Sequence, residues 1–143
     1  MIVLAMREEL KLVPEDLAGE PALITGPGAV NVIRALKDVP RAERIYNFGY
    51  VGSNVLPVGA RCRIGKVAMY HPAAGINDRT FMLDGDVPCY TAGDFVTHTE
   101  ITEPCVFDME LAVILALGFH NVTSLKIVSD NLSTKEFEEC LKK

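Results

Sequence analysis

Short, unbroken apolar runs limit what this 143-residue chain can fold into more than any other feature of its sequence. Residues 1–5 (MIVLA) and 21–25 (PALIT) are two such runs, and each is typical of a strand covered on both faces. Residues 29–36 follow a Gly-Pro-Gly turn and carry apolar side chains at helical spacing, which predicts an amphipathic helix closed by Pro40. The pattern of the first 36 residues therefore predicts an α/β fold.

The rest of the chain continues this alternation. Further strands are expected over residues 43–49, 61–70, 89–97 and 125–130, with a short one near 81–83 inside a loop over 71–88. Glycine-rich residues 49–54 (GYVGSN) are expected to form a loop. Helices are expected over 108–117 and after Ser133 or Thr134, where Glu136 suits a capping box. This order predicts a single three-layer αβα domain over residues 1–143, with a mixed central sheet.

Composition narrows the classes of partner. Fourteen Lys and Arg residues against nineteen Asp and Glu give a net charge of −5, which repels a nucleic-acid backbone or an anionic membrane surface. The apolar stretch 106–117 is interrupted by acids and is too short to span a bilayer. The amino terminus places its apolar run before its acids, unlike a signal peptide. We therefore expect a cytoplasmic protein that binds neither nucleic acid nor membrane.

The four cysteines show no pattern of a disulfide framework or a metal site. Cys62, Cys89, Cys105 and Cys140 are scattered, without a CxxC motif or a histidine at ligand spacing. We expect all four to be buried, reduced thiols, and no bound metal.

Polar residues follow several of the predicted strands. Glu8 and Glu9 come after the first strand, Gly26-Pro27-Gly28 after the second, and Ser129 and Asp130 after the last. Ligands of α/β sheets bind at such strand ends. The glycine turn is either a tight turn, which is the commoner case, or a backbone cradle for an anion or a hydroxyl group. Asp130, taken alone, is more often a helix cap or turn residue than a site residue.

A carboxylate within the predicted apolar helix is harder to place. Glu110 lies between Met109 and Leu111, and burying it without a partner would cost several kcal/mol, as a rough estimate. Asp108 and Glu110 are two positions apart and would diverge by roughly 200° on a helix. A covered helix would therefore turn at least one of them away from solvent.

Seven segments, in order, resemble the superfamily of purine nucleoside phosphorylases and methylthioadenosine/S-adenosylhomocysteine nucleosidases. The segments are LAMREEL (4–10), TGPGAVNVIRAL (25–36), IYNFGYVGS (45–53), VGARCRIGKVAMYH (58–71), AGDFVT (92–97), FDMELAVILALG (107–118) and KIVSD (126–130). Each is weak alone, but together they span most of the chain. The resemblance implies a nucleoside phosphorylase-like fold, shortened in the region of residues 71–97.

The resemblance also implies a role for individual residues. Asp130 would be the general acid that protonates the purine, steered by Ser129, and Glu9 would orient or deprotonate the attacking water. Glu110 would hold the ribose hydroxyl groups while Met109 packs against the sugar. Further binding residues would be Phe95 or Val96 beside the base, where the alignment is ambiguous by one residue, and Gly49 and Tyr50 in the substrate loop. A carboxylate beside the sugar and an acid beside the base suit the charges that develop when an N-glycosidic bond breaks.

Two substitutions depart from the family pattern near the attacking water. Tyr50 stands where the family has a small serine and could fill part of the pocket. Lys126 stands where the family has an arginine, which keeps the charge and loses the planar fork.

The resulting hypothesis is hydrolysis of a purine nucleoside, such as 5′-methylthioadenosine or S-adenosylhomocysteine. It implies no metal or organic cofactor, and a homodimer whose neighbouring subunit could complete the pocket. The alternatives are a non-catalytic nucleoside- or purine-binding protein of the same fold, and a nucleoside phosphorylase. No arginine cluster suited to phosphate stands out, which favours water over phosphate as the nucleophile.

Overall fold

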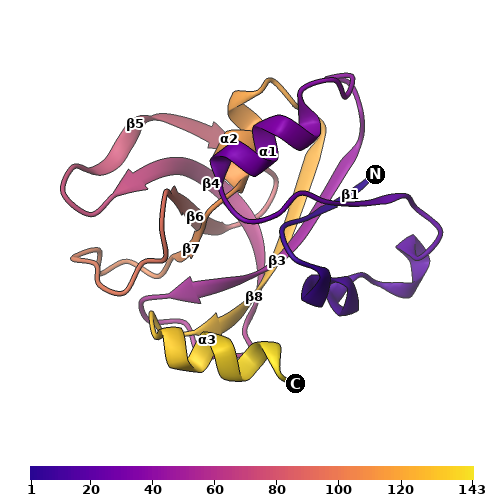
Figure 1. Cartoon of the computed structure of the whole chain (residues 1–143). Helices are drawn as coiled ribbons and strands as arrows, with labels where there is room; N and C mark the ends of the chain where they lie inside the picture. The colour runs from indigo at the N-terminus through magenta and orange to yellow at the C-terminus, as the bar shows by residue number, and fades with distance from the viewer.

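The computed structural model describes residues 1–143 and places eight strands in one sheet (Figure 1). The strands are β1 (Ile2–Leu4), β2 (Ala22–Ile24), β3 (Ile45–Ser53), β4 (Arg61–His71), β5 (Gly75–Met82), β6 (Val87–Ala92), β7 (Val106–Asp108) and β8 (Val122–Asp130). The helices are α1 (Ala29–Leu36), α2 (Leu111–Ala116) and α3 (Thr134–Leu141), with the 3-10 helices η1 (Arg7–Leu12) and η2 (Glu15–Leu17). Parallel and antiparallel pairings both occur, so the expected mixed sheet is confirmed.

Five of the strands close into a barrel. β3 pairs with β7, β7 with β6, β6 with β4, β4 with β8, and β8 again with β3. β1 and β2 extend the sheet from β3, while β5 extends it from β4. The expected three-layer αβα arrangement is not confirmed. Irregular registers in β3 and β4 mark where these long strands change partner, and the sheet closes on itself there.

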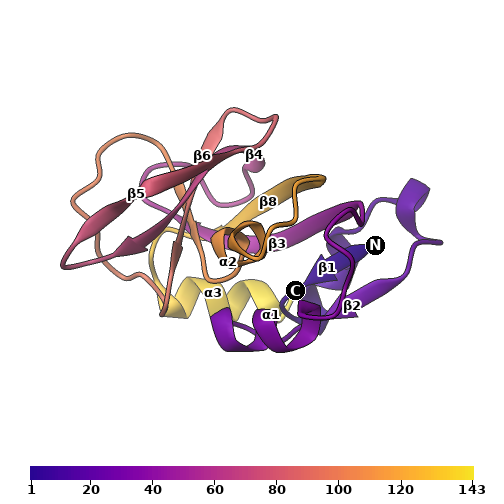
Figure 2. The same cartoon turned by 90° about the horizontal axis from the view of Figure 1, so that it is seen from above.

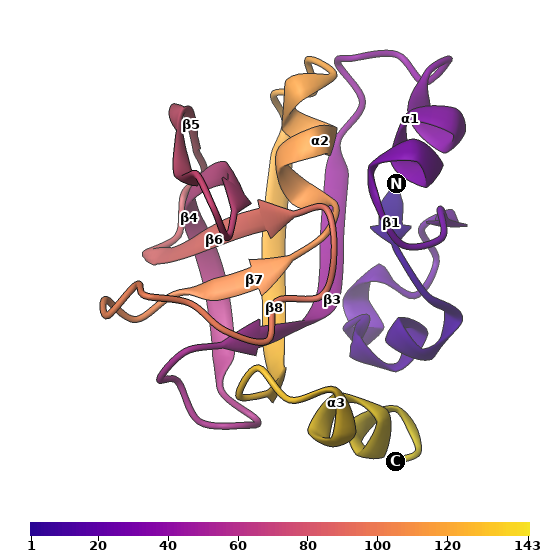
Figure 3. The ribbon, with the colours of Figure 1, turned by 60° about the vertical axis from the view of Figure 1, so that its left-hand side comes forward.

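The helices occupy different ends of the barrel. β3 and β8 run side by side in Figure 3, with α2 beside their upper half and α3 below their lower end. α2 packs against β4, β6 and α1, which explains why its sequence is apolar on nearly every face. Viewed from above in Figure 2, α1 and α3 lie on the side of the molecule opposite the β4–β5–β6 region.

Several sequence-based boundaries are wrong. Residues 49–53, expected to be a loop, complete β3, and most of the loop expected over 71–88 is the edge strand β5. Most β5 side chains are exposed, so the segment lacks the apolar run by which a strand is recognised. The strand expected over 89–97 ends at Ala92. The helix expected over 108–117 begins only at Leu111, because β7 ends at Asp108.

The cysteines follow their expected burial with one exception. Cys62, Cys89 and Cys105 are buried, and burial raises the pKa of each thiol. Cys140 is only partly buried, because α3 covers the sheet with one face and leaves the other in solvent.

None of the helices is both long enough and apolar enough to cross a lipid bilayer.

Two glycines make a close backbone contact beside the β4–β5 hairpin. A Cβ atom at Gly65 would lie 2.3 Å from the carbonyl oxygen of Gly85. We expect Gly65→Ala to lower the free energy of unfolding by about 1–3 kcal/mol in chemical denaturation, because the backbones must separate. Gly19→Ala is the control, since no atom lies within 4 Å of its Cβ position, and it should change stability by less than about 0.5 kcal/mol. Equal stability of the two variants would contradict this contact.

Candidate functional site

One cavity is lined by carboxylates from four separate segments of the chain. Its volume is about 150 Å³, which is enough for a group the size of one aromatic ring before any rearrangement. The acidic residues that line it are Glu9 from η1, Asp94 just after β6, Asp108 and Glu110 at the end of β7, and Asp130 at the end of β8. The closed sheet brings these strand ends together, as expected for a ligand site in an α/β fold.

Glu9 is buried and held by backbone amides. Its Oε1 accepts hydrogen bonds from the amides of Ala5 and Met6, both at 3.0 Å, and its Oε2 accepts one from the amide of Tyr50 at 2.8 Å. Burial raises the pKa of Glu9, while Lys126 and these amides oppose the rise. Glu8, which shares its position after β1, is exposed.

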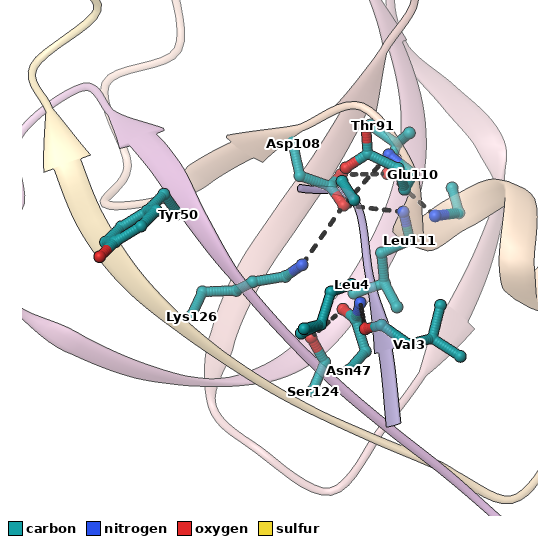
Figure 4. Close-up of polar contacts among 12 residues, drawn as sticks. Val3, Leu4, Asn47, Tyr50, Thr91, Asp108, Glu110, Leu111, Ser124 and Lys126 are labelled. Atoms are coloured by element: carbon teal, nitrogen blue, oxygen red, sulfur yellow. Dashed lines mark hydrogen bonds and ion pairs between the residues drawn. The ribbon is translucent and has the colours of Figure 1, made fainter. Parts of the chain in front are cut away.

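Gly49 and Tyr50 act on the site through their backbones. Gly49 does not line the cavity, but a Cβ atom there would lie 2.9 Å from Glu9 Oε2 and 3.2 Å from Lys126 Nζ. The absence of a side chain therefore leaves room for both charged groups. The ring of Tyr50 points away from Lys126 in Figure 4, and only its amide binds Glu9. The tyrosine side chain consequently leaves the contact between the amide and Glu9 intact.

Asp108, Lys126 and Thr91 form a buried polar cluster (Figure 4). Lys126 Nζ lies 3.7 Å from Asp108 Oδ2, and both side chains are 2% exposed. Asp108 Oδ1 accepts a 2.5 Å hydrogen bond from the Thr91 hydroxyl group. Burial alone would lower the pKa of Lys126, but the surrounding acids, Asp108 foremost, raise it above its usual value. Lys126 is therefore a buried cation.

Sequence reasoning missed this cluster as part of the site. It placed Asp108 and Glu110 on different faces of one helix, which is wrong because a strand ends at the first residue and Glu110 precedes the helix. Both residues line the cavity. Only one sequence feature suggests a buried polar cluster, namely a lysine within the predicted strand over residues 125–130 (LKIVSD).

Glu110 is the N-cap residue of α2, and its carboxylate reaches across to α1. Glu110 Oε2 accepts a 2.8 Å hydrogen bond from the amide of Gly28, which adopts a φ of +91° as the N-cap of α1. The turn at Gly28 therefore acts as the backbone cradle that was one of its two interpretations. The group that it binds is the carboxyl group of Glu110, a side chain of the protein itself. Burial, reinforced by the negative charge of Asp108, raises the pKa of Glu110 to about 7.

Asp130 is buried and is both a turn residue and a cavity residue. Its Oδ1 accepts a 2.6 Å hydrogen bond from the Ser129 hydroxyl group, and its Oδ2 accepts a 3.2 Å bond from the amide of Ser133. A Cβ atom at Gly52 would lie 3.0 Å from Asp130 Oδ2, so the glycine gives the carboxylate room. Burial raises the pKa of Asp130, and its hydrogen bonds oppose that rise.

Aromatic and apolar side chains form the rest of the wall. The rings of Phe95 and Phe137 meet with centroids 5.5 Å apart and planes inclined by 54°. Phe95, Val96 and Met109 line the cavity. Their roles in binding stay predictions. Phe137 comes from α3 and was not predicted, because nothing in its sequence distinguishes it from an ordinary residue on the apolar face of a helix.

The predicted site residues therefore converge, with one exception. The cavity is lined by eight of them: Glu9, Tyr50, Phe95, Val96, Met109, Glu110, Ser129 and Asp130. Gly49 lies behind Glu9 and contributes space rather than a surface.

Solved structures with a similar fold include nucleosidases and a futalosine hydrolase. A variant of the Helicobacter pylori methylthioadenosine/S-adenosylhomocysteine nucleosidase, with 5′-methylthioadenosine in its active site, aligns with a TM-score of 0.78 at 15% identity, over 99% of this chain and 90% of that one. The Neisseria meningitidis nucleosidase, in complex with methylthio-immucillin-A, aligns with a TM-score of 0.74 at 20% identity over the same shares. A futalosine hydrolase mutant of Helicobacter pylori reaches 0.74 at 14% identity, again over 99% and 90%.

At these identities the likeness shows a shared fold, and the nucleosidase-like fold expected from the sequence is confirmed. No protein-family model matches the sequence, and no curated protein matches it.

The raised pKa of Glu110 predicts a pH-dependent cost to stability. The folded protein holds this proton more tightly than the unfolded chain, so the contribution of Glu110 to stability is lost as pH rises from about 4.5 to about 7. Glu110→Gln removes the ionisation and keeps an oxygen for the Gly28 amide. We expect the free energy of unfolding of the variant, minus that of the parent, to increase by about 2–3 kcal/mol as the pH rises from 5 to 8. Chemical denaturation at each pH measures this difference. A difference between the proteins that does not change with pH would contradict the shift.

Proposed function

We propose that this protein hydrolyses the N-glycosidic bond of a purine nucleoside such as 5′-methylthioadenosine or S-adenosylhomocysteine. One observation carries the proposal: Glu9, Glu110 and Asp130, which are far apart in the sequence, line one cavity. Breaking this bond leaves positive charge on the sugar and negative charge on the base. Carboxylates at one end of a cavity and a protonated acid at the other stabilise both charges.

Asp130 is the general acid of this proposal. Its raised pKa keeps a proton on the group closer to neutral pH than an exposed aspartate would, so it can donate that proton to a ring nitrogen of the leaving purine. The hydroxyl group of Ser129 fixes one carboxyl oxygen. Phe95 and Phe137 offer an apolar wall against which a purine can stack.

Glu9 and Glu110 act at the sugar end. Glu9 is the proposed general base: its three amide contacts fix the carboxylate, and the rise in its pKa makes it a better proton acceptor than an exposed glutamate. Glu110 accepts hydrogen bonds from the ribose hydroxyl groups, and Met109 packs against the sugar. The carboxylate of Glu110 also stabilises the positive charge that develops on the sugar.

The charges around the cavity favour water over phosphate as the nucleophile. No lysine or arginine lines the cavity, and the nearest buried cation, Lys126, is already paired with Asp108. A phosphate dianion would enter a space surrounded by carboxylates, whereas a water molecule carries no charge to repel. A futalosine hydrolase shares this fold with the nucleosidases, so the fold by itself does not decide the substrate. A homodimer and a cytoplasmic location stay predictions from the sequence.

Chromatographic detection of adenine tests the proposal. Incubation with 5′-methylthioadenosine should release adenine in buffer without phosphate. Asp130→Asn should slow this release by about a hundredfold or more, because asparagine cannot supply the proton. Asp78→Asn, an exposed residue on β5, is the matched control and should cleave at the parental rate.

The other outcomes separate the alternatives. Cleavage only when phosphate is present would identify a phosphorylase, and binding without product in either buffer would identify a nucleoside-binding protein. Full activity of Asp130→Asn would remove Asp130 from the acid role.

A further inference from the structure

Both carboxylate oxygens of Asp108 have partners within the protein, although the proposed reaction gives this residue no role. Its Oδ1 binds the Thr91 hydroxyl group at 2.5 Å. Its Oδ2 accepts hydrogen bonds from the amides of Leu111 at 2.7 Å and Glu110 at 3.3 Å, and faces Lys126. These contacts join β6, β7, β8 and the first turn of α2 at one carboxylate (Figure 4).

The same contacts fix the conformation of Glu110. Its backbone is held at φ −133° and ψ −38°, outside the helical region, by the hydrogen bond from its own amide to Asp108. Thr91 completes the attachment, because its oxygen also accepts a 2.9 Å hydrogen bond from the amide of Ala112. At the far end of the side chain, Gly28 binds the carboxylate. Glu110 is therefore held at its backbone by Asp108 and at its tip by α1.

Asp108 and Glu110 are coupled by their charges as well as by the contacts between them. Lys126 from β8 is the single cation among three carboxylates, those of Glu9 from η1, Asp108 and Glu110. Cys89 from β6 is the other titratable group beside Asp108, and burial keeps its thiol protonated. One ammonium group cannot neutralise three carboxylates, so a proton on one acid relieves the excess negative charge. Glu110, with its raised pKa, is the acid that takes it.

We propose that Asp108 is a positioning residue for Glu110, because it fixes the turn that presents Glu110 to the cavity. The charge of Asp108 also decides above which pH Glu110 is a carboxylate that accepts hydrogen bonds from sugar hydroxyl groups. This inference rests on the proposed function for the identity of the ligand. It predicts that affinity for the sugar of a nucleoside depends on pH near neutrality. Affinity for a free purine base, which has no hydroxyl groups to offer, does not.

Calorimetry with two probes tests the inference in the intact protein. Formycin A is a purine-like nucleoside whose sugar is joined through carbon, so it cannot be hydrolysed, and adenine is the matched probe without a sugar. We expect the Kd of formycin A to rise by about tenfold or more from pH 8 to pH 5.5, because Glu110 gains its proton. The Kd of adenine should change by less than about threefold over the same range. In Asp108→Asn, which is nearly isosteric and uncharged, the change for formycin A should also fall below about threefold.

Thr91→Val separates positioning from charge. It removes the hydroxyl group that holds Asp108 but leaves the charge of Asp108 in place. We expect this variant to bind formycin A more weakly than the parent by a similar factor at pH 5.5 and at pH 8, so that the pH dependence of the parent is retained. If Asp108→Asn fails to fold, this variant still tests the positioning role, and loss of the pH dependence in Thr91→Val would overturn the division of roles.

Carbon-13 NMR titration of Glu110 in the free protein distinguishes failure of this inference from failure of the proposed function. The carboxyl resonance should titrate near pH 7 in the parent and at clearly lower pH in Asp108→Asn. Identical titration in both proteins would overturn the role of Asp108, whatever the protein binds. If neither formycin A nor adenine binds while the titration shifts as expected, the proposed function is wrong and the coupling of the two acids stands.

Discussion

The interaction on which the site depends is the buried contact between Lys126 and Asp108. Taking an ammonium group and a carboxylate out of water is costly, and the cost is offset only where the partners and the surrounding hydrogen bonds are good. Asp108 meets that condition through Thr91 and the first turn of α2. Lys126, in turn, acts to lower the pKa of both Glu9 and Glu110, so it partly opposes the effect of burial on these two carboxylates. Lys126 is the single cation set against these carboxylates, and its charge offsets only part of their mutual repulsion.

Closure of the sheet gives the site its position. β3 carries the Tyr50 amide that binds Glu9 and, two residues further on, Gly52 beside Asp130, while β8 carries both Lys126 and Asp130. Because β3 and β8 pair along nearly their whole length, the proposed water-activating end and the proposed base-protonating end are set by one strand pair. The helices then supply what the strands lack: the Gly28 amide from the start of α1 and the ring of Phe137 from α3.

The sequence predicted parts of this site through the seven segments that resemble the nucleoside phosphorylase and nucleosidase superfamily, since no local signal was specific by itself. The carboxylates at Glu9 and Asp130 follow apolar runs, and strand ends of an α/β sheet meet at one edge. Glu110 drew notice as an acid within an apolar segment. Tyr50 was expected to disturb the pocket, and nothing in its identity shows that its amide, rather than its ring, faces Glu9. Asp108 and Phe137 resembled an exposed helical acid and an ordinary core residue, so sequence periodicity alone could not assign them to the cavity.

What the sequence by itself determined is the set of local elements, since apolar periodicity and turn residues act over a few neighbouring positions. It determined α1 over Ala29–Leu36, narrowed the N-cap of α3 to Ser133 or Thr134, of which the structure uses Ser133, and placed the polar residues after their strands. Only the tertiary structure decided that the strands close into a barrel and that Gly28 binds Glu110 across 82 positions of the chain. Contacts of that range depend on how the whole sheet bends and on which charges must share a buried space, and no window of sequence contains both partners.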